Sequence, residues 1–225
     1  AAGELAIDEV NAFLNESGAD WTMTLVVEDT QCLPDVCLDK VESLHARGID
    51  LLIGPLSSGE LSNIMTYCNT EHILTISQSS TAPALGSPDF VFRYCPNDMW
   101  QGRAIARLLL VSNVTYVVPT WRADAWGDGL EEQGKLRFEA LGGTFSTEYV
   151  RYSVPREDFS VEASTLNDIV TDALATYSED EVAVWAISFE EIKAYMDEAI
   201  AYPNLAKVKW FGSDGTTNTP GLIDP

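Results

Sequence analysis

Apolar and polar positions along this chain change between two spacings. Short continuous apolar runs, such as Leu51–Ile53 and Val182–Ile187, are typical of strands buried on both faces of a sheet. The longer segments between them place apolar residues at helical spacing, as in Trp100–Leu110. Because strands and helices alternate, the pattern predicts an α/β fold with parallel sheets and right-handed crossovers.

The predicted elements follow one another along the whole chain. Strands are expected over Trp21–Val27, Ile49–Ile53, the first part of Ile73–Thr81, Phe90–Tyr94, Asn113–Pro119, Thr144–Val150, Val182–Ile187 and Val208–Gly212. Helices are expected over Leu5–Leu14, Pro34 to Gly48, a run ending at Asn69, Trp100–Leu110 with Asp98 as its N-cap, Gly127–Leu141, Asp158 to about Tyr177, and Glu190–Ala201. We therefore expect two α/β lobes, over residues 1–97 and 98–225.

Two turns rich in hydroxyl groups follow neighbouring strands in the first block. One comes after Ile53 and contains Ser57 and Ser58, and the other runs to Thr81. In an open parallel sheet, ligands bind at the carboxyl ends of the strands, where helix N-termini offer free N–H groups and a positive dipole end. The stretch Leu51–Leu85 is therefore the predicted centre of a ligand site.

Composition restricts the class of partner. The chain has 225 residues, of which 46% are hydrophobic, so it can bury a substantial core. Its 35 acidic and 13 basic residues give a formal net charge of −22 at pH 7. A field of this sign repels phosphate groups, which excludes nucleic acids and anionic membranes as partners. We interpret the acidity as a solvated surface suited to a salty or extracellular setting.

The chain lacks the common signatures of catalysis. No Gly-x-Ser-x-Gly elbow, His-Glu-x-x-His motif or P-loop occurs, and His45 and His72 lie on segments that point away from the predicted site. The four cysteines permit two disulfides in an oxidising compartment. Zinc is the alternative, but Cys-x4-Cys at Cys32 and Cys37 with two distant cysteines is poor ligand spacing. We expect no enzymatic activity, metal or cofactor.

Several short segments, taken together in their order and spacing, resemble a known family over essentially the whole chain. They are Ala6–Asn11, Glu28–Pro34, Ile53–Ser58, Ile76–Leu85, Phe92–Arg93, Gln101–Gly102, Ala125–Gly129 and Phe211–Gly215. The family is that of the type I periplasmic binding proteins, specifically the branched-chain amino-acid binding class and the related receptor ligand-binding domains. The resemblance implies a clamshell of two lobes, each a parallel sheet flanked by helices, that closes on a small ligand.

The resemblance also implies roles for residues of the first lobe. Ser58 matches the serine at a helix N-terminus that receives the ligand carboxylate. Ser79, Ser80 and Thr81 match the loop that holds the carboxylate and ammonium. The alternative for all four is that they cap helices and turns.

Three further matches lie in the second lobe. Trp126 stands where the family usually has a tyrosine that covers the ligand, and Asp214 where amino-acid binders carry an acid for the α-ammonium. Phe189 is a weaker match to another aromatic wall. A zwitterion needs donors, a negative partner and an apolar wall, so the chemistry of this set is appropriate. The alternatives are a packed loop aromatic for Trp126 and a turn brace for Asp214.

The resemblance implies an extracellular or periplasmic protein that captures a small polar ligand, most often an amino acid, for ABC-type uptake. Its partners would be a membrane permease or a sensor protein, with membrane association through a segment not in this chain. The alternatives are the ligand-sensing ectodomain of a receptor and an interaction module without ligand. A homodimer is a further expectation.

Two expectations concern the limits of the chain and its cysteines. In this family a first strand, inside the sheet of the first lobe, precedes the helix that begins here near Leu5. We therefore expect a chain truncated at both ends, or a gap that another chain fills, because an interior strand cannot be removed without leaving backbone groups unpaired. For the cysteines, we prefer the pairs Cys32 with Cys37 and Cys68 with Cys95, although four cysteines allow three connectivities.

Overall fold

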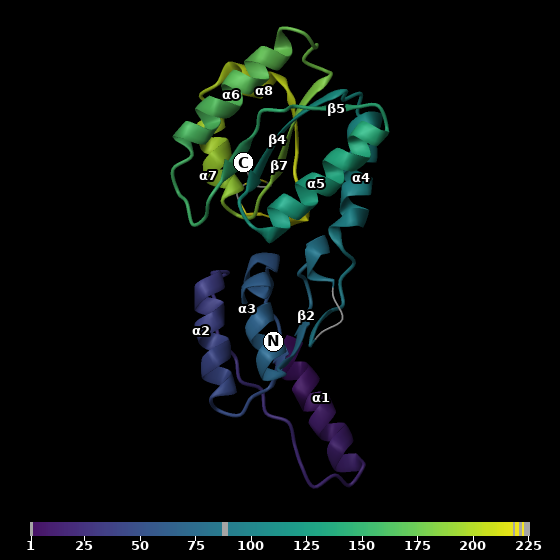
Figure 1. Ribbon diagram of the computed structural model, residues 1–225, viewed down its shortest axis with the longest axis vertical. Coiled ribbons are helices and arrows are strands. Elements are labelled where there is room, and N and C mark those ends of the chain that lie inside the picture. Colours follow the sequence, from purple (N-terminus) through teal and green to yellow (C-terminus); the bar gives the residue numbers. More distant parts are fainter. Residues whose placement is uncertain (1, 87–89, 218, 221, 223–225) are drawn as a thin grey trace.

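The chain folds into two α/β lobes that lie one beyond the other along the longest axis (Figure 1). The structure is a computed structural model that describes residues 2–86, 90–217, 219, 220 and 222. Each lobe has its own parallel sheet, and the chain passes between them through residues 94–97. The predicted α/β class with parallel sheets is confirmed. No helix in the described part of the chain is long and apolar enough to cross a bilayer.

The first lobe is built on three strands in the order β1–β2–β3. These strands are β1 (Leu51–Ile53), β2 (Leu74–Ser77) and β3 (Val91–Arg93). Two helices, α2 (Pro34–His45) and α3 (Ser58–Glu71), lie side by side, and their buried faces form one apolar core with the lobe (Figure 1). The η1 turn (Pro83–Leu85) closes this core near the second lobe.

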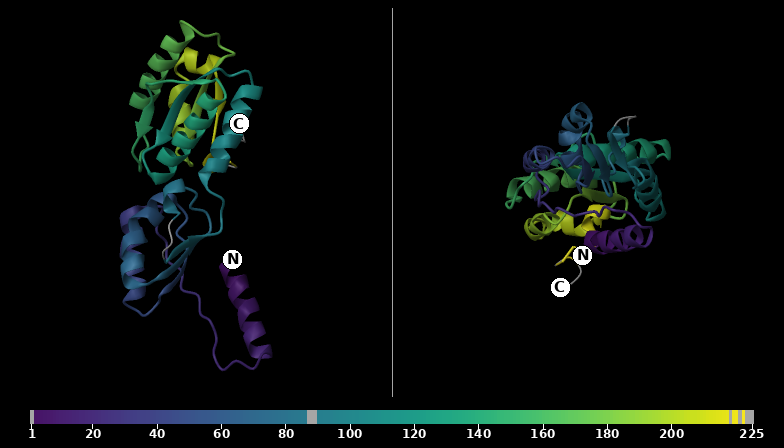
Figure 2. Two further views of the ribbon diagram at one scale, coloured as in Figure 1. Left: turned by 45° about the vertical axis from the view of Figure 1, so that its right-hand side comes forward. Right: turned by 90° about the horizontal axis from the view of Figure 1, so that it is seen from below.

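The second lobe contains the larger sheet, in the order β5–β4–β7–β8. Its strands are β4 (Tyr116–Arg122), β5 (Thr144–Phe145), β6 (Val150–Tyr152), β7 (Val182–Ile187) and β8 (Lys209–Phe211). Helices α4 (Asp98–Val111) and α5 (Ala125–Ala140) cover one face, and α6 (Ser160–Leu174), α7 (Ile192–Ala199) and α8 (Pro203–Lys207) cover the other (Figures 1 and 2). Every residue of β7 is buried, because it lies between these two layers.

One predicted strand of this lobe is divided in two. The sequence predicts a single strand over Thr144–Val150, but β5 and β6 pair with β4 at separate places, through Tyr116 and Val117 for β5 and through Thr120–Arg122 for β6. Between them the Ser146 hydroxyl accepts a hydrogen bond from the Glu148 N–H at 3.2 Å. This local turn takes the chain away from the ladder between the two short strands.

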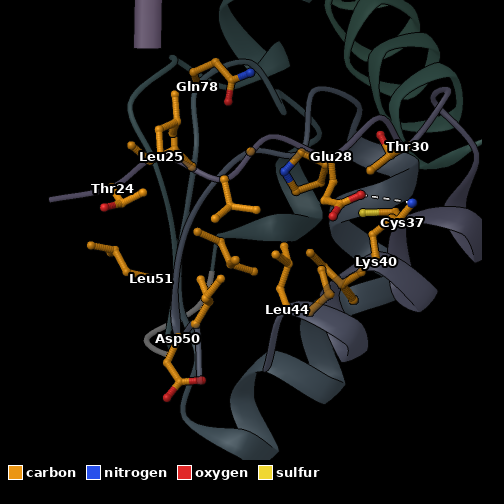
Figure 3. Close-up of a pocket in the computed structure, with 18 of the residues that line it drawn as sticks. Thr24, Leu25, Glu28, Thr30, Cys37, Lys40, Leu44, Asp50, Leu51 and Gln78 are labelled. Carbon is orange, nitrogen blue, oxygen red and sulfur yellow. Dashed lines mark hydrogen bonds and ion pairs between the residues drawn. The ribbon is translucent and has the colours of Figure 1, made fainter. Parts of the chain in front are cut away.

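The predicted strand over Trp21–Val27 is wrong. The segment follows α1 (Ala2–Glu16) and runs without regular secondary structure, and the Asn11 side chain holds both backbone groups of Met23, at 2.8 and 3.0 Å. A cavity of about 540 Å³ lies between this segment and β1, with Leu25 and Leu51 on its wall (Figure 3). The apolar sequence is present, but it has no strand beside it to complete a ladder.

The position of this cavity bears on the expected gap in the first sheet. β1 pairs with β2 on one side, and no described strand pairs with its other edge. Apolar side chains border the open edge, so Val27 is 77% and Ile53 is 79% exposed. Figure 2 shows α1 standing beside the lobe. The side chains of Leu5 and Phe13 on this helix are also largely exposed. That an extended segment from elsewhere fills the gap stays a prediction.

Hydrogen exchange tests the state of residues 21–27. Their amides should exchange at least about a hundredfold faster than the amides of β7, because they lack ladder hydrogen bonds and lie at the surface. Exchange measured by NMR or mass spectrometry reports this difference directly. Protection of residues 21–27 equal to that of β7 would show that they pair as a strand in solution.

Candidate ligand-binding site

The N-terminus of α3 carries the first predicted site residue. Ser57 is the N-cap, and it forms a capping box with Glu60, whose Oε2 accepts from the Ser57 N–H at 3.0 Å. Ser58 is the first helical residue and is buried, and its hydroxyl accepts a hydrogen bond from the Ala82 N–H at 3.0 Å. Ser58 therefore joins α3 to the chain that follows the second hydroxyl-rich turn.

The two hydroxyl-rich turns lie side by side, as the sequence predicts. The Ser77 hydroxyl donates to the Pro55 carbonyl at 2.9 Å and lies 2.8 Å from the Ser80 hydroxyl. Ser79 donates to the Leu56 carbonyl at 2.7 Å. The side chains of Ser79 and Ser80 therefore tie one turn to the other, which leaves the Thr81 side chain as the one turned to the second lobe, beside Asp98.

Asp98 is the feature of the site that sequence reasoning assigned wrongly. Its predicted role as N-cap belongs to Asn97, whose side chain accepts from the Met99 N–H at 3.1 Å. Asp98 is instead the first residue of α4, is only 1% exposed, and donates its N–H to the Thr81 carbonyl at 2.9 Å. Neither carboxylate oxygen has a hydrogen-bond partner among the described residues. A buried carboxyl group in this state is costly to ionise unless a cation joins it.

The electrostatics of Asp98 reflect this isolation. Burial raises the pKa of Asp98 from 3.8 to about 7, and the negative charge of Asp214 raises it further. The Thr81 hydroxyl, which lies near the carboxylate but outside hydrogen-bond geometry, and the Arg93 guanidinium lower this pKa. The carboxyl group is thus poised between its charged and neutral forms near neutral pH, and a nearby positive charge would favour the charged form.

Asp214 lies in the same group of residues. It begins the η2 turn (Asp214–Thr216) after β8, and its Oδ1 accepts from the Gln101 side-chain amide at 2.9 Å. Thr81, Asp98, Gln101 and Asp214 therefore come together from the end of the first lobe, the start of α4 and the end of β8. The sequence does carry a signal for Asp98, because it lies in the first turn of the same helix as Gln101-Gly102, one of the segments that resemble the family.

The aromatic residues predicted for the second lobe also meet. Trp126 stacks on Phe189, with ring centroids 4.5 Å apart and an angle of 18° between the planes. A Cβ on Gly215 would lie 2.5 Å from Phe189 Cδ1 and 2.6 Å from Trp126 Cη2, so only glycine lets the Asp214 turn pass this pair. Trp126 is buried, which means that most of its area packs within the second lobe.

The two lobes touch through the first turns of α5. A Cβ on Gly59 would lie 3.5 Å from Asp124 Cβ, and one on Gly129 would lie 2.9 Å from Pro83 Cδ. Gly59 and Pro83 belong to the first lobe, whereas Asp124 and Gly129 belong to the second. The predicted site residues of both lobes therefore lie at one boundary.

Other candidate groups lie elsewhere. His45 contacts Asp50 at 2.6 Å, and His72 ends α3, so both are at the opposite end of the first lobe. The cavity of Figure 3 contains none of the predicted ligand residues, and its mainly apolar wall lies along the open edge of β1.

The expected disulfides are not formed, because all four cysteines are free thiols in this structure. Cys68 lies at the end of α3, where its carbonyl accepts from the Ile73 N–H. Cys95 lies beyond β3, and its thiol contacts the Ser80 carbonyl. Helix α3 runs back along the sheet, so the Cys68 and Cys95 thiols are at opposite ends of the strands.

The chain is similar to known proteins over nearly its whole length. Residues 1–225 match the family described as the receptor family ligand binding region. The chain belongs to this family. Its fold is that of the type I periplasmic binding proteins, as the resemblance implied. The structure of a leucine binding protein, LivK from Thermotoga maritima, superposes with a TM-score of 0.75 at 20% identity, over 96% of this chain and 60% of that chain.

Two relatives are similar in sequence. An uncharacterised protein of Methanocaldococcus jannaschii, MJ1266, is 34% identical over 228 residues, which cover 98% of this chain and 53% of the relative. The chemotactic signal transduction system substrate-binding protein BasB of Halobacterium salinarum is 31% identical over 113 residues, 47% of this chain and 27% of BasB. The chain therefore spans about half the length, or less, of the curated relatives it matches.

The isolation of Asp98 predicts a pH-dependent stability. Its pKa is higher in the folded protein than the ordinary value of 3.8, so its ionisation costs stability; the cost is absent below about pH 4 and complete above about pH 7. Asp98→Asn has no charge to bury. It should be more stable than the wild type by roughly 2–4 kcal/mol at pH 8 and lose this advantage as the pH falls toward 4, in thermal unfolding.

Asp158→Asn is the matched control. Its pKa is lowered by hydrogen bonds from Ser160, so this variant should lose a little stability at neutral pH instead of gaining any. A gain for Asp98→Asn that is the same at every pH would contradict the assignment.

Proposed function

We propose that this protein is a solute-binding protein that captures an amino acid, or a similar small zwitterion, between its two lobes. The carboxylates of Asp98 and Asp214 receive the α-ammonium, with the Thr81 hydroxyl beside them. Ser58, Ser79 and Ser80 shape the turns that face the ligand carboxylate, where the N-terminus of α3 supplies a positive field. Trp126 and Phe189 form an apolar wall for the side chain.

The observation that supports this ligand class most strongly is the state of Asp98. Its carboxylate is buried without a hydrogen-bond partner among the described residues, and a second carboxylate, Asp214, acts on it. Two neighbouring carboxylates repel each other, and a single ammonium group would relieve both the repulsion and the missing hydrogen bonds. A neutral ligand group would leave the repulsion between the two carboxylates in place, and an anionic group would add to it.

The proposed binding role also implies a location and a transport partner for the protein. The family and the fold are of a binding-protein type. We infer a non-enzymatic protein of the extracellular or periplasmic space, held at the membrane by a segment outside this chain. The closed, liganded form would deliver the ligand to an ABC-type permease.

A sensory role is the second candidate function. The observation that favours it is the similarity to BasB, whose name places it in a chemotactic signal transduction system. In this case the closed form would be recognised by a membrane sensor instead of a permease. The ligand site would be the same, so the two functions differ in the partner and not in the binding chemistry.

Calorimetric titration with the twenty standard L-amino acids tests the ligand class. At least one should bind, and Asp98→Asn and Asp214→Asn should each weaken it by about tenfold to a hundredfold, because each removes a charge-assisted hydrogen bond to the ammonium. Asp158→Asn, on the same lobe but exposed and bonded only to its own turn, should bind as the wild type does.

A second titration tests the charge that is recognised. Amines that lack the carboxylate should retain part of the affinity, whereas N-acetylated amino acids, which lack the ammonium, should bind at least about a hundredfold more weakly. Equal binding of free and N-acetylated forms would refute the role of Asp98 and Asp214.

A further inference from the structure

A buried arginine lies behind the aromatic wall of the second lobe. Arg122 is the last residue of β4, and its side chain is only 7% exposed. Its Nε donates to Asp124 Oδ2 at 2.6 Å and its Nη1 donates to Glu191 Oε1 at 3.1 Å. The Nε and Nη1 donors of Arg122 are thus paired with two separate carboxylates, and both ion pairs are largely shielded from water.

The guanidinium also contacts the aromatic wall itself. Arg122 Cζ lies 4.2 Å from the centroid of the Phe189 ring, in the geometry of a cation–π interaction. Phe189 in turn stacks on Trp126. The three side chains therefore form a continuous stack, with Phe189 between Arg122 and Trp126.

Asp124 connects Arg122 to the helix that carries Trp126. While Oδ2 of Asp124 accepts from Arg122, its Oδ1 caps α5 by accepting from the N–H groups of Trp126 at 3.1 Å and Gly127 at 2.9 Å. Asp124 also packs against Gly59 of the first lobe. The same carboxylate thus fixes the arginine, the start of α5 and the contact between lobes.

Glu191 connects Arg122 to the chain that carries Phe189. It lies two residues after Phe189, just before α7, and the Tyr152 hydroxyl lies 3.5 Å from its Oε1 and 2.8 Å from the Ser188 hydroxyl. Both flanks of Phe189 are therefore held by this network.

We propose that Arg122 is a positioning residue for ligand binding, and that it holds Trp126 and Phe189 in the orientation that the ligand requires. This inference rests on the proposed function, because it concerns the same site. A buried charge bonded to two carboxylates is weak evidence for added stability, since desolvation offsets much of its attraction. Arg122 is nevertheless well suited to holding its neighbours in one orientation, because the guanidinium is planar and its donors point in fixed directions.

Substitutions at Arg122 test the proposal in the full chain. Arg122→Met retains the length of the side chain and removes its charge and donors, and Arg122→Lys retains the charge without the planar fork. Affinity for the amino acid that binds most tightly among the twenty should fall at least about tenfold in Arg122→Met and about threefold or more in Arg122→Lys. The near-ultraviolet circular dichroism of the Trp126–Phe189 pair, identified by its loss in Trp126→Phe, should change in both.

Arg151→Met is the matched control. Arg151 also bonds a carboxylate of α5, donating to both oxygens of Asp128 at 2.7 Å, but the side chains of this pair are 42% and 45% exposed, and neither is part of the stack of Arg122, Phe189 and Trp126. This variant should change affinity by less than about twofold, as expected for a surface ion pair, and leave the dichroism as in the wild type.

The outcomes separate the proposal from the proposed function. A folded Arg122→Met with unchanged affinity and dichroism would overturn the positioning role, as would a variant that loses only thermal stability. If Arg122→Met does not fold, the same two readouts on Arg122→Lys decide the matter. If the wild type binds no amino acid, the proposed function fails, and the dichroism alone then decides whether Arg122 positions the aromatic pair.

Discussion

Parallel strands place their carboxyl ends at the same edge of a sheet, and the candidate site of this protein depends on that constraint. β2 ends in the serine-rich turn, β4 ends at Arg122, β7 leads to Phe189, and β8 leads to Asp214. The two sheets present these edges to one another across the boundary between lobes, where Asp124, the N-cap of α5, lies near Gly59 of α3. Residues distant in sequence therefore gather at one place without any of them being neighbours in the chain.

Two buried charges at this boundary are treated in opposite ways. Arg122 is bonded to Asp124 and Glu191, so its burial is compensated within the protein. Asp98 has no such partner among the described residues, and its pKa is raised accordingly. A compensated charge fixes geometry, whereas an uncompensated one creates a demand for a ligand of opposite charge. We therefore propose a supporting role for Arg122 and a role in ligand recognition for Asp98.

The two lobes differ in how completely they are built. The second lobe has helices on both faces of its sheet, and all of β7 is buried. In the first lobe, β1 has an edge that no described strand covers, and apolar side chains such as Val27 and Ile53 are exposed beside a large cavity. The site residues of the first lobe lie in two turns that Ser77 and Ser58 tie together, and Leu56 and Gln78 of these turns also line the cavity.

The sequence by itself determined the α/β class, the order of most elements and the pairing of the two hydroxyl-rich turns, because periodicity and turn residues are local properties. It misjudged Trp21–Val27, because an apolar run becomes a strand only where another strand lies beside it. It also took Asp98 for a cap, since an acid at a helix start normally is one. Only the tertiary structure decided that Asn97 caps the helix while Asp98 is buried near Asp214, and that Arg122 lies against Phe189. Burial and charge pairing depend on which segments meet in space, and no single stretch of the sequence determines those contacts.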